Sequence, residues 1–425
     1  MLDLKAIRSE PEKFLRLLEA KGAAENLNRL LDLDYQRRQL VTKTDELKSL
    51  RNRVSDEIAR LKRAGAAAED KIKEMKSVSL QIKEQDEQIR SLEEQIHQIL
   101  ITLPNIPHAS VKIGRSAADN EVVKIWGEVP TYDFPLKDHL DLAENLGIID
   151  FKRAAKISGT GFPLYVGDGA VLERALVNFM LDFHRKKHGY REVFPPFLVN
   201  RDSAFSTGQL PKLEEDMYLT SEDDLFLIPT AEVPVTNIHR DEIIPENKLP
   251  IKYVAYSGCF RREAGSYGKE TRGLSRVHQF NKVELVWFTI PETSYDVHEK
   301  LLQDAEEILQ ALNLHYRVVS LCSGDLSFAA AKCYDIEVWA PGTGKYFEVS
   351  SVSNFEDFQA RRANIRYRRS GDNRVGYVHT LNGSGVATPR LMIALLETYQ
   401  TDEGTIVVPE ALQPYTGFSL IKTTV

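Results

Sequence analysis

Apolar residues recur at intervals of seven along residues 30–61, the spacing of a helix that pairs with another helix through one seam. The seam positions are Leu30, Leu33, Leu40, Leu47, Leu50, Val54, Ile58 and Leu61. This pattern predicts a helix from about Asn28 to Arg63. At about 1.5 Å per residue the helix is roughly 50 Å long, enough to reach well beyond a globular body.

A second series with the same period follows in residues 75–99. It consists of Met75, Ile82, Ile89 and Ile96, with Val78, Leu92 and Ile99 at the other seam position. The intervening residues 64–70 contain alanines and a glycine, which allow the chain to reverse. We therefore predict an antiparallel two-helix coiled-coil arm over about residues 28–100.

The helical pattern stops at two prolines. Pro104 and Pro107 cannot continue a regular helix, because proline lacks a backbone donor and disfavours helical geometry just before it. We place a domain boundary there, with an N-terminal domain over residues 1–104 and a second domain over residues 105–425. Beyond residue 120, short β-like runs alternate with isolated helices, which indicates an α+β fold.

The second domain contains one clear helix and two clear hairpins. Asp168 is placed to cap the helix and Gly189 follows its basic end. Its apolar stripe consists of Leu172, Ala175, Leu176, Phe179 and Phe183. The hairpins are expected from residues 260–263 with 277–284 and from residues 334–340 with 346–351, so antiparallel pairing is favoured throughout.

Composition narrows the class of protein. The chain has 425 residues, 42% of them hydrophobic, which excludes wholesale disorder. Its net charge is -7, so a polyanionic partner has to meet a local basic patch. There is no apolar run of about 18 residues, and the first residues are too charged for a signal peptide, so we expect a cytoplasmic protein without a membrane partner. Cys259, Cys322 and Cys333 lack metal-ligand spacing, and no structural zinc is expected.

A basic patch does occur near the reversal of the arm. It consists of Arg60, Lys62, Arg63, Lys71, Lys73 and Lys76. Three acidic residues, Glu69, Asp70 and Glu74, lie among them, so the patch carries a local excess of three positive charges. Charge alone favours a solvated helix surface, whereas a position at a projecting tip favours contact with phosphates; both interpretations stay open.

Charged residues inside the first predicted hairpin indicate a ligand site. Arg261 and Glu263 alternate on one face of a strand, and Arg276 and Phe280 lie on its expected partner. Such a surface suits a nucleotide, because arginine binds phosphate, phenylalanine stacks on a base and a carboxylate accepts from an exocyclic amine. Taken singly, each residue is more commonly part of a salt bridge or a core.

Two further segments add anion and cation binding. Residues 382–385 lead into a helix that starts with Pro389 and carries Arg390 in its first turn, and a helix start favours anions. Glu348, Ser350 and Ser351 offer hard oxygen ligands for Mg²⁺. Alone, these features describe a packed helix with a surface arginine and a polar strand.

In combination these segments resemble a class II aminoacyl-tRNA synthetase over nearly the whole chain, and specifically the bacterial-type seryl-tRNA synthetases. The three motifs of the class correspond to residues 189–198 with Pro196, residues 260–263 with 276–280, and residues 385–390. The resemblance to the seryl family rests on Thr-Ala-Glu at 230–232, Lys-Val-Glu at 282–284, Glu-Val-Ser-Ser at 348–351 and Asn-Gly-Ser-Gly at 382–385.

The resemblance implies a fold and an activity. The family fold is a mainly antiparallel sheet flanked by helices, with the N-terminal coiled coil reaching from a homodimer to the extra arm of tRNA(Ser). The implied reaction activates L-serine with ATP and Mg²⁺ to seryl-adenylate and pyrophosphate, and then passes serine to the 3′ end of tRNA(Ser). Whether tRNA(Sec) is also charged is left open by the sequence.

The resemblance also assigns residues. The implied catalytic residues are Arg261 and Arg390. The serine site is implied at Thr230, Ala231, Glu232, Arg261, Glu284 and Ser384. The ATP site is implied at Arg261, Arg262, Glu263, Arg276, Val277, Phe280, Glu348, Val349, Ser350, Ser351 and Arg390, with Mg²⁺ on Glu348 and Ser351. Arg262 is expected to point away from its neighbours, and the loop 264–273 to become ordered when ATP or the tRNA end arrives.

Two other functions remain as alternatives. A ligase that loads a carrier protein lacks a full arm, whereas this chain has regular seams on both helices. A non-enzymatic coiled-coil adaptor with an inactive body predicts loss of Arg261, Glu348 or Arg390, and all three are present.

Overall fold

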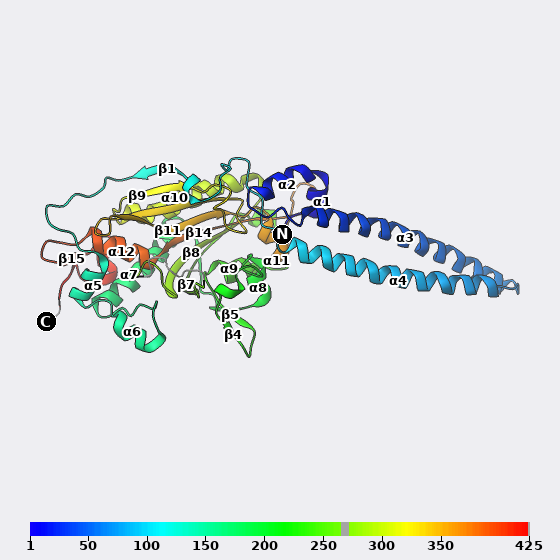
Figure 1. Ribbon diagram of the computed structural model, residues 1–425, viewed down its shortest axis with the longest axis horizontal. Coiled ribbons are helices and arrows are strands. Elements are labelled where there is room, and N and C mark those ends of the chain that lie inside the picture. The colour runs from blue at the N-terminus through cyan, green and yellow to red at the C-terminus, as the bar shows by residue number, and fades with distance from the viewer. Residues whose placement is uncertain (265–271, 424–425) are drawn as a thin grey trace. The chain divides into compact units, whose positions relative to one another are not determined.

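The structure is a computed structural model that describes residues 1–264 and 272–423. The chain divides into two compact units, Leu2–Pro104 and Asn105–Val425 with Met1 (Figure 1). The expectation about the loop 264–273 concerns residues 265–271, which lie outside the described residues. No helix among the described residues is both long enough and apolar enough to span a membrane.

The first unit is entirely helical. Its helices are α1 (Leu4–Ser9), α2 (Pro11–Glu19), α3 (Leu27–Arg63) and α4 (Glu69–Leu100). The long helices α3 and α4 run side by side and the chain reverses between them, with Gly65 in a left-handed conformation (Figure 1). Their seam contains Leu47, Leu50, Val54, Ile58, Met75, Val78 and Ile82. The predicted coiled-coil hairpin is therefore confirmed.

Polar residues also lie in this unit's interior. Asp34 is buried and receives hydrogen bonds from Arg8 at 3.2 Å, Arg37 at 3.2 Å and Arg38 at 3.0 Å, which ties α1 to α3. Further along the seam, Thr44 donates to the Gln85 side chain at 2.8 Å. A polar pair at one level of an apolar seam favours a single register of the two helices.

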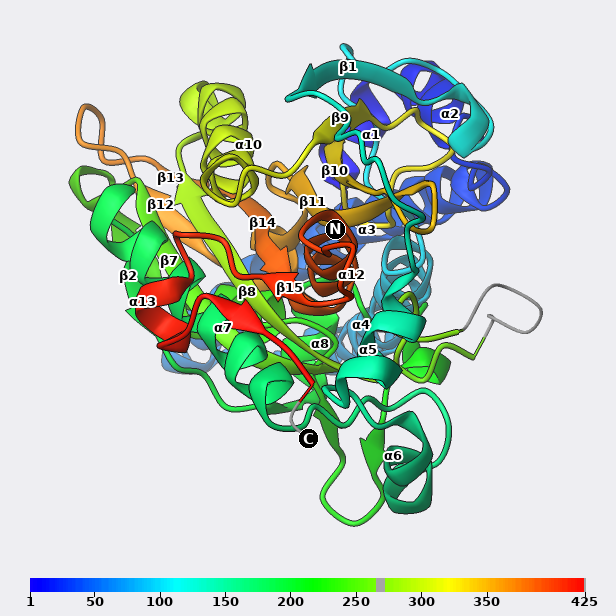
Figure 2. The same cartoon turned by 90° about the vertical axis from the view of Figure 1, so that its left-hand side faces the viewer.

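The second unit is built on a sheet of eight strands in the order β1-β9-β10-β11-β14-β8-β7-β2 (Figure 2). These strands are β1 (Glu121–Trp126), β2 (Arg191–Val193), β7 (Ile251–Phe260), β8 (Gln279–Thr289), β9 (Tyr316–Ser320), β10 (Lys332–Ala340), β11 (Lys345–Asn354) and β14 (His379–Ala387). The pairs in this sheet are antiparallel except β2–β7, which is parallel. The α+β class is confirmed, while the expectation of antiparallel pairing throughout is wrong at β2.

The two faces of the sheet differ in chemistry because side chains alternate along a strand. On β8, Val283, Leu285 and Trp287 face a large apolar core. The alternate residues of β8 face the other way, where Val286 and Phe288 join a smaller core and Lys282 and Glu284 are polar. The large core lies under helices, and the polar end of the opposite face carries the site described below.

Among the helices, the largest contributions to the large core come from α7 (Asp168–Lys187), α10 (Ser294–Ala311) and α12 (Thr388–Thr398). The predicted stripe of α7 faces this core, although Gly167 rather than Asp168 occupies the capping position, and Asp168 is the first helical residue. The shorter helices are α5 (His139–Leu146), α6 (Phe151–Ser158), α8 (Arg201–Ser206), α9 (Glu232–Thr236), α11 (Phe358–Ala363) and α13 (Gln413–Thr416).

Smaller sheets and turns complete the unit. The small sheets comprise β3 (Leu198–Asn200), β4 (Leu219–Thr220), β5 (Leu225–Leu227), β6 (Ile243–Pro245), β12 (Arg366–Arg368), β13 (Val375–Tyr377), β15 (Ile406–Val407) and β16 (Leu420–Ile421). The short 3₁₀ turns are η1 (Ala117–Asp119), η2 (Glu214–Asp216), η3 (Asn237–His239), η4 (Glu246–Lys248) and η5 (Pro291–Thr293).

Both predicted hairpins are present. The strands β7 and β8 pair from Ile251↔Phe288 to Phe260↔Gln279, and β10 pairs with β11. However, Arg261 and Glu263 lie beyond the end of β7 instead of alternating on it, and Glu263 has a φ of 52°. The strand ends at Phe260, so the expected shared strand face for Arg261 and Glu263 is wrong, and their convergence comes from the turn that follows.

Candidate active site

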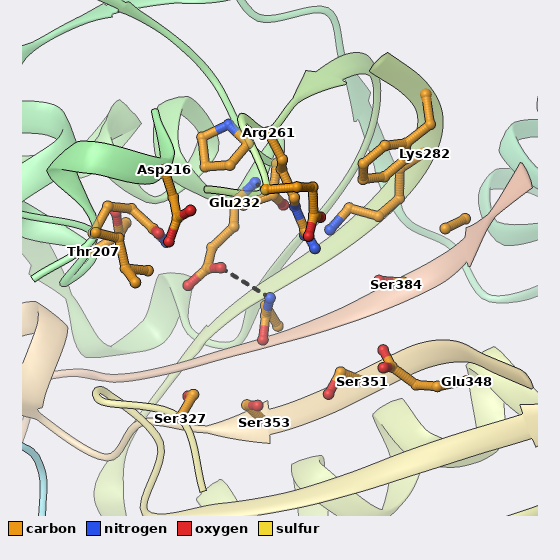
Figure 3. Close-up of a pocket in the computed structure, with 18 of the residues that line it drawn as sticks. Thr207, Asp216, Glu232, Arg261, Lys282, Ser327, Glu348, Ser351, Ser353 and Ser384 are labelled. Atoms are coloured by element: carbon orange, nitrogen blue, oxygen red, sulfur yellow. Dashed lines mark hydrogen bonds between the residues drawn. The ribbon is translucent and has the colours of Figure 1, made fainter. Parts of the chain in front are cut away.

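A cavity of about 650 Å³ lies over the polar face of the sheet (Figure 3). Its walls come from β8, β11 and β14, from the start of α12, and from segments around residues 207–217, 229–232, 261–263, 274–277 and 327–329. The sequence-predicted residues on its wall are Thr230, Glu232, Arg261, Glu263, Arg276, Val277, Phe280, Glu348, Val349, Ser351, Ser384 and Arg390. Most of the residues assigned from the sequence are therefore brought together in one space.

Four assigned residues do not line this cavity. Ala231 is fully buried, and Arg262 is exposed with its backbone N–H donating to the Asp216 carbonyl at 2.9 Å. Ser350 is buried and donates to the Ser384 carbonyl at 2.7 Å. Glu284 is fully buried directly behind the wall. These residues support the wall rather than form its surface.

The Arg261 guanidinium lies over the face of the Phe280 ring, so that a cation stacks on an aromatic plate. The Arg261 guanidinium carbon lies 5.2 Å from the centre of the Phe280 ring. The backbone of Arg261 is fixed on both sides by His278, since its N–H donates to the His278 carbonyl at 2.9 Å and its carbonyl lies 3.0 Å from His278 Nδ1. This arrangement offers a phosphate-binding charge next to a surface on which a base can stack.

Glu263 and Arg276 form an ion pair at the same end of the cavity. Both side chains are partly buried, so the Glu263 carboxylate is held in one orientation at the cavity wall. A carboxylate fixed in this way, close to an aromatic plate, can accept a hydrogen bond from an exocyclic amine.

Arg390 lies in the first turn of α12 and reaches two other elements. Its Nε donates to the Ser275 carbonyl at 3.0 Å, and one terminal nitrogen donates to the Glu348 carbonyl at 2.9 Å. The register of β14 shifts between Ser384 and Ala387, and Val386 has a φ of 110°. This irregularity redirects the strand into the helix, so Arg390 and Ser384 face the same cavity.

Three oxygen-bearing side chains gather where β10 and β11 pair. Ser351 donates a hydrogen bond to Asp335, and Glu348 lies further along the same strand. Burial, and then the negative charge of Glu348, raises the pKa of Asp335 to about 8. Two carboxylates that repel each other beside a hydroxyl are the kind of hard donor set that fits Mg²⁺, which would relieve the repulsion.

A buried carboxylate pair lies at the polar end of this sheet face, with Glu232 on the cavity wall and Glu284 behind it. Glu284 accepts from Thr230 at 2.8 Å and from Lys282 at 2.6 Å. Asn382 donates to both carboxylates, at 3.0 Å to Glu284 and at 3.1 Å to Glu232 (Figure 3). Burial, followed by the charge of Glu284, raises the pKa of Glu232 to about 7. This end therefore favours a small cationic group that also carries hydrogen-bond donors.

Several residues of this polar end were not found from the sequence. Lys282 neutralises Glu284, Asn382 bridges the two carboxylates, and Gln359 donates to Glu232 at 2.6 Å. The Asn382 side-chain oxygen is buried without a hydrogen-bond partner among the described residues. The alternation of Lys282 with Glu284 was visible in the sequence, but Gln359 belongs to α11 and its role depends on tertiary packing.

A buried carboxylate on α7 links the elements beneath the cavity. Glu173 accepts from the Asn281 side chain at 2.8 Å and from the Thr388 hydroxyl. Asn281 follows Phe280 on β8, and Thr388 starts the helix that carries Arg390. Burial raises the pKa of Glu173 to about 7. Glu173 thus connects the strand that carries Phe280 to the helix that carries Arg390.

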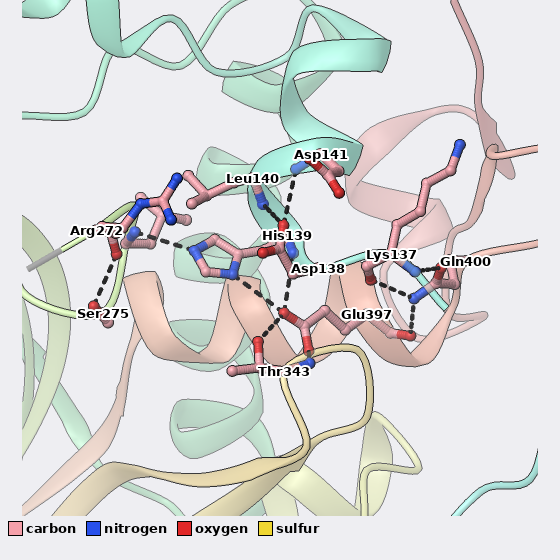
Figure 4. Close-up of polar contacts among 11 residues, drawn as sticks. Lys137, Asp138, His139, Leu140, Asp141, Arg272, Ser275, Thr343, Glu397 and Gln400 are labelled. Carbon is pink, nitrogen blue, oxygen red and sulfur yellow. Dashed lines mark hydrogen bonds and ion pairs between the residues drawn. The ribbon is translucent and has the colours of Figure 1, made fainter. Parts of the chain in front are cut away.

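A second polar cluster fixes the segment that precedes Arg276 (Figure 4). The buried Glu397 on α12 accepts from the backbone N–H of Thr343 at 2.7 Å, and its carboxylate lies 3.1 Å from His139 Nδ1. The other ring nitrogen of His139 accepts from the Leu274 N–H at 3.4 Å. Gly342 packs so closely on this cluster that a Cβ there would meet the Lys137 carbonyl at 2.1 Å.

Comparison with known proteins agrees with this geometry. Residues 215–399 match the tRNA synthetase class II core domain (G, H, P, S and T), and residues 1–107 match the seryl-tRNA synthetase N-terminal domain. The site and its fold thus define a class II aminoacyl-tRNA synthetase.

The relatives narrow the class to one family. The chain is 59% identical over 426 aligned residues to the serine–tRNA ligase of Chlorobium phaeobacteroides strain BS1, covering 99% of this chain and 100% of that protein. A crystal structure of seryl-tRNA synthetase from Pyrococcus horikoshii complexed with ATP superposes with a TM-score of 0.96 at 39% identity, covering 100% of both chains. The chain belongs to the seryl-tRNA synthetase family.

A more distant structure gives the same result. The cytoplasmic serine–tRNA ligase of Naegleria fowleri in complex with AMP matches with a TM-score of 0.90 at 29% identity, covering 100% of this chain and 99% of that chain. The family resemblance, the α+β class with its helical arm and the enzyme class expected from the sequence are confirmed.

Proposed function

We propose that this protein activates L-serine with ATP to give seryl-adenylate and pyrophosphate, and then transfers serine to the 3′ end of tRNA(Ser). The observation that carries the proposal is one cavity with two unlike binding surfaces. One is an arginine over an aromatic plate, and the other is a buried carboxylate pair, with Glu232 on the wall and Glu284 behind it. An amino acid and a nucleotide bound to these surfaces would meet within the cavity.

ATP is assigned to the Phe280 end. Adenine stacks on Phe280, and the carboxylate of Glu263, held by Arg276, accepts from the adenine amine. Arg261 binds the α-phosphate and the serine carboxylate, and Arg390 binds the terminal phosphates. Val277 and Val349 line the same wall, while Arg262 and Ser350 contribute through the backbone and packing behind it.

The magnesium ion that accompanies ATP is assigned to Glu348 and Ser351. Their oxygens suit a hard divalent cation, and such an ion supplies positive charge to the phosphates. Asp335 accepts a hydrogen bond from Ser351 and so fixes the direction of that hydroxyl. Arg390 also contacts Glu348, at 3.4 Å, so the arginine and the proposed ion ligands meet at one point.

Serine is assigned to the carboxylate pair. Glu232, Thr230 and Ser384 line the cavity, with Glu284 and Ala231 supporting them from behind. The substrate ammonium is attracted to the carboxylates, and the substrate hydroxyl pairs with polar groups that alanine would leave unsatisfied. A site of this kind rejects the analogue that lacks the hydroxyl, by up to about 10⁴-fold.

The chemistry depends on positioning and on charge. The serine carboxylate attacks the α-phosphorus as the bond to pyrophosphate breaks, and Arg261 and Arg390 stabilise the negative charge that builds up. In the second step the 3′-hydroxyl of the tRNA forms an ester with the seryl carbonyl as AMP leaves. Serine and ATP are held close together, so the enzyme mainly lowers the entropic and electrostatic cost of reaction.

The N-terminal unit is proposed to bind tRNA, over residues 1–104, while residues 105–425 form the catalytic domain. In the basic patch, Lys71 pairs with Glu57 at 2.5 Å. The other five cations, which make no ion pair with a described residue, are Arg60, Lys62, Arg63, Lys73 and Lys76. Unpaired cations near the helix reversal support contact with the phosphates of tRNA(Ser).

A homodimer and a cytoplasmic location complete the proposal. The segment 189–198 contains the short edge strand β2, which pairs on one side with β7, and Phe194 directly after the strand is 74% exposed. An exposed aromatic next to an open strand edge supports an interface with a second copy. Charging of tRNA(Sec) is compatible with the same site, because that reaction uses the same amino acid.

The test is exchange of pyrophosphate into ATP, run with each amino acid in turn, with Mg²⁺ and without tRNA. Exchange that depends on serine alone is expected, and aminoacylation of tRNA(Ser) should follow when the RNA is added. Exchange with a different amino acid would contradict the pocket assignment. Silence with every amino acid, from folded protein, would favour the adaptor alternative.

A further inference from the structure

A buried histidine and a buried glutamate form a pair outside the cavity. His139 is 5% exposed and Glu397 is fully buried, and neither side chain lines the cavity wall. Glu397 Oε1 accepts from the His139 backbone N–H at 3.0 Å and lies 3.1 Å from His139 Nδ1. The backbone N–H and the hydroxyl of Thr343 donate to the same carboxylate, at 2.7 Å and 2.6 Å. Both carboxylate oxygens therefore have donors, which fix the carboxylate in one orientation.

The other side of the His139 ring meets the segment that leads to Arg276. Its Nε2 lies 3.4 Å from the backbone nitrogen of Leu274, and a backbone N–H can only donate. Nε2 is therefore the acceptor and carries no hydrogen, so Nδ1 carries the hydrogen and donates it to Glu397. Figure 4 shows the ring between Glu397 and the segment that contains Ser275. The glutamate thus selects the form of the ring that can accept from Leu274.

The pair joins three elements that contribute to the proposed ATP site. These elements are the segment that follows Leu274, helix α12 and strand β11, which begins two residues after Thr343. They carry Arg276, Arg390 and Glu348, respectively. We propose that His139 is a positioning residue for ATP, because it holds these elements in fixed relative positions. The inference rests on the proposed function, since it concerns the ATP site of the same reaction.

The segment held by the ring also contacts Arg390 directly. The carbonyl of Ser275, the residue after Leu274, accepts from Arg390 Nε at 3.0 Å. A shift of Leu274 away from the ring moves this carbonyl, and Arg390 then loses a partner that directs its guanidinium. Arg276 is the next residue, so its ion pair with the carboxylate proposed for adenine moves as well. Loss of the contact at His139 therefore affects both the base and the phosphates of ATP.

Close packing leaves this contact little freedom. Gly273 has a φ of 66°, and a Cβ there would lie 2.3 Å from His139 Nε2. On the other side of the pair, a Cβ at Gly342 would lie 3.2 Å from the carboxyl carbon of Glu397. A side chain at Gly273 would consequently push the segment away from the ring, which offers a second way to break the contact.

Two replacements of His139 separate its two side-chain hydrogen bonds. The asparagine amide can donate to Glu397 but is too short to reach Leu274, whereas the glutamine carbonyl can take the place of Nε2 and accept from Leu274. In serine-dependent pyrophosphate exchange, His139→Asn should raise KM for ATP about tenfold and leave KM for serine close to that of the parent. His139→Gln should keep a KM for ATP close to that of the parent. Equal effects of the two variants, or an unchanged KM for ATP in His139→Asn, would overturn the inference.

His315→Asn is the matched control for the loss of a buried imidazole. His315 is 7% exposed, and its ring lies 3.0 Å from the Gly127 carbonyl and 2.7 Å from the Tyr346 hydroxyl. This variant should lower the melting temperature about as much as His139→Asn does, with no change in KM for ATP. An equal rise in KM for ATP would mean that general loss of packing is responsible, and it would contradict the inference.

A variant that leaves the His139–Glu397 pair unchanged tests the same contact, even where His139→Asn does not fold. Gly273→Ala inserts a Cβ between the segment and the ring, so it should also raise KM for ATP about tenfold. In the double variant with His139→Asn the two effects should not multiply, because both changes remove one contact. Effects that multiply, or an unchanged KM for ATP in Gly273→Ala, would overturn the inference. Failure of the parent to exchange pyrophosphate would instead contradict the proposed function.

Discussion

The pKa values of buried carboxylates are shifted in opposite directions in the helical unit and in the cavity. Burial acts to raise the pKa of Asp34, but hydrogen bonds from Arg8 and Arg37 and the charge of Arg38 outweigh it and hold the pKa below its ordinary value. In the cavity, the carboxyls of Glu232 and Asp335 have raised pKa values of about 7 and 8. A carboxylate matched by cations holds the fold together, whereas one that is buried beside another carboxylate favours the arrival of a cationic ligand.

The largest effect on activity is expected when Arg261, a cation of the cavity, is replaced. Arg261→Ala removes the charge proposed for the α-phosphate and should reduce pyrophosphate exchange by about 10³-fold. The melting temperature should change little, because the Arg261 side chain is exposed and its backbone bonds persist. Normal exchange by this variant would show that the cavity cation is structural, like those around Asp34.

A smaller effect is expected at the carboxylate pair. Glu232→Gln keeps the shape and a partner for Asn382 but removes a charge, so KM for serine should rise about tenfold or more while KM for ATP stays close to that of the parent. Steady-state exchange at varied serine and varied ATP separates the two constants. Equal increases in both constants would mean that Glu232 only supports the wall.

The carboxyl of Glu232 also predicts that the binding of serine depends on pH. Its pKa is about 7, above its ordinary value, so it is partly protonated near neutral pH and must lose that proton to attract the serine ammonium. Serine should bind more tightly as the pH rises from about 6 to about 8, by up to about tenfold, with release of a proton. Calorimetry in two buffers of different ionisation enthalpy measures that release, and Glu232→Gln should abolish it.

In the helical unit, Asp34→Asn should change stability and leave catalysis alone. We expect a loss of about 1 kcal/mol, since the three arginines remain partly exposed and water screens them. The pKa of Asp34 is lowered by folding, so its contribution is present above the ordinary value and disappears as the pH falls through the folded value. Urea unfolding at neutral and acidic pH checks this, with pyrophosphate exchange as the control.

The smallest effect is expected at the basic patch. Replacing Lys73 and Lys76 together by alanine should raise KM for tRNA(Ser) about threefold at low salt and much less at high salt, because screening weakens exposed charges. Pyrophosphate exchange should not respond. Lys83→Ala, at an exposed position further along α4, serves as the control. An equal response at Lys83 would mean that the patch has no special role.

The parts of the molecule that were predictable are those governed by local periodicity. Seam residues such as Leu47 and Ile82 belong to a seven-residue repeat that continues over tens of residues, so the pairing of the two helices could be deduced from this spacing. Arg261 was assigned to a ligand site and does line the cavity, but the strand face predicted for it was wrong because β7 ends one residue earlier. Local alternation does not show where a strand stops.

Other site residues depend on contacts that sequence spacing does not reveal. Asn382 bridges two carboxylates only because β14 pairs with β8, and Gln359 reaches Glu232 only because α11 packs behind the site. Asp335 gains its importance from the register that sets it opposite Ser351. From the sequence alone, none of these residues can be distinguished from other polar residues, because their partners depend on how the strands and helices are arranged.

The order of strands in the large sheet sets the distance between residues that are proposed to bind the substrates. Arg261 follows β7 and Glu348 lies on β11, with β8 and β14 between them. Three steps between neighbouring strands set these rows about 14 Å apart, at about 4.8 Å per step. Loops around the cavity can lengthen or shorten without altering this spacing, but a strand cannot be inserted or removed. Changes that direct this enzyme toward other amino acids are therefore easier to make at the rim of the cavity than in the distance between the rows that carry Arg261 and Glu348.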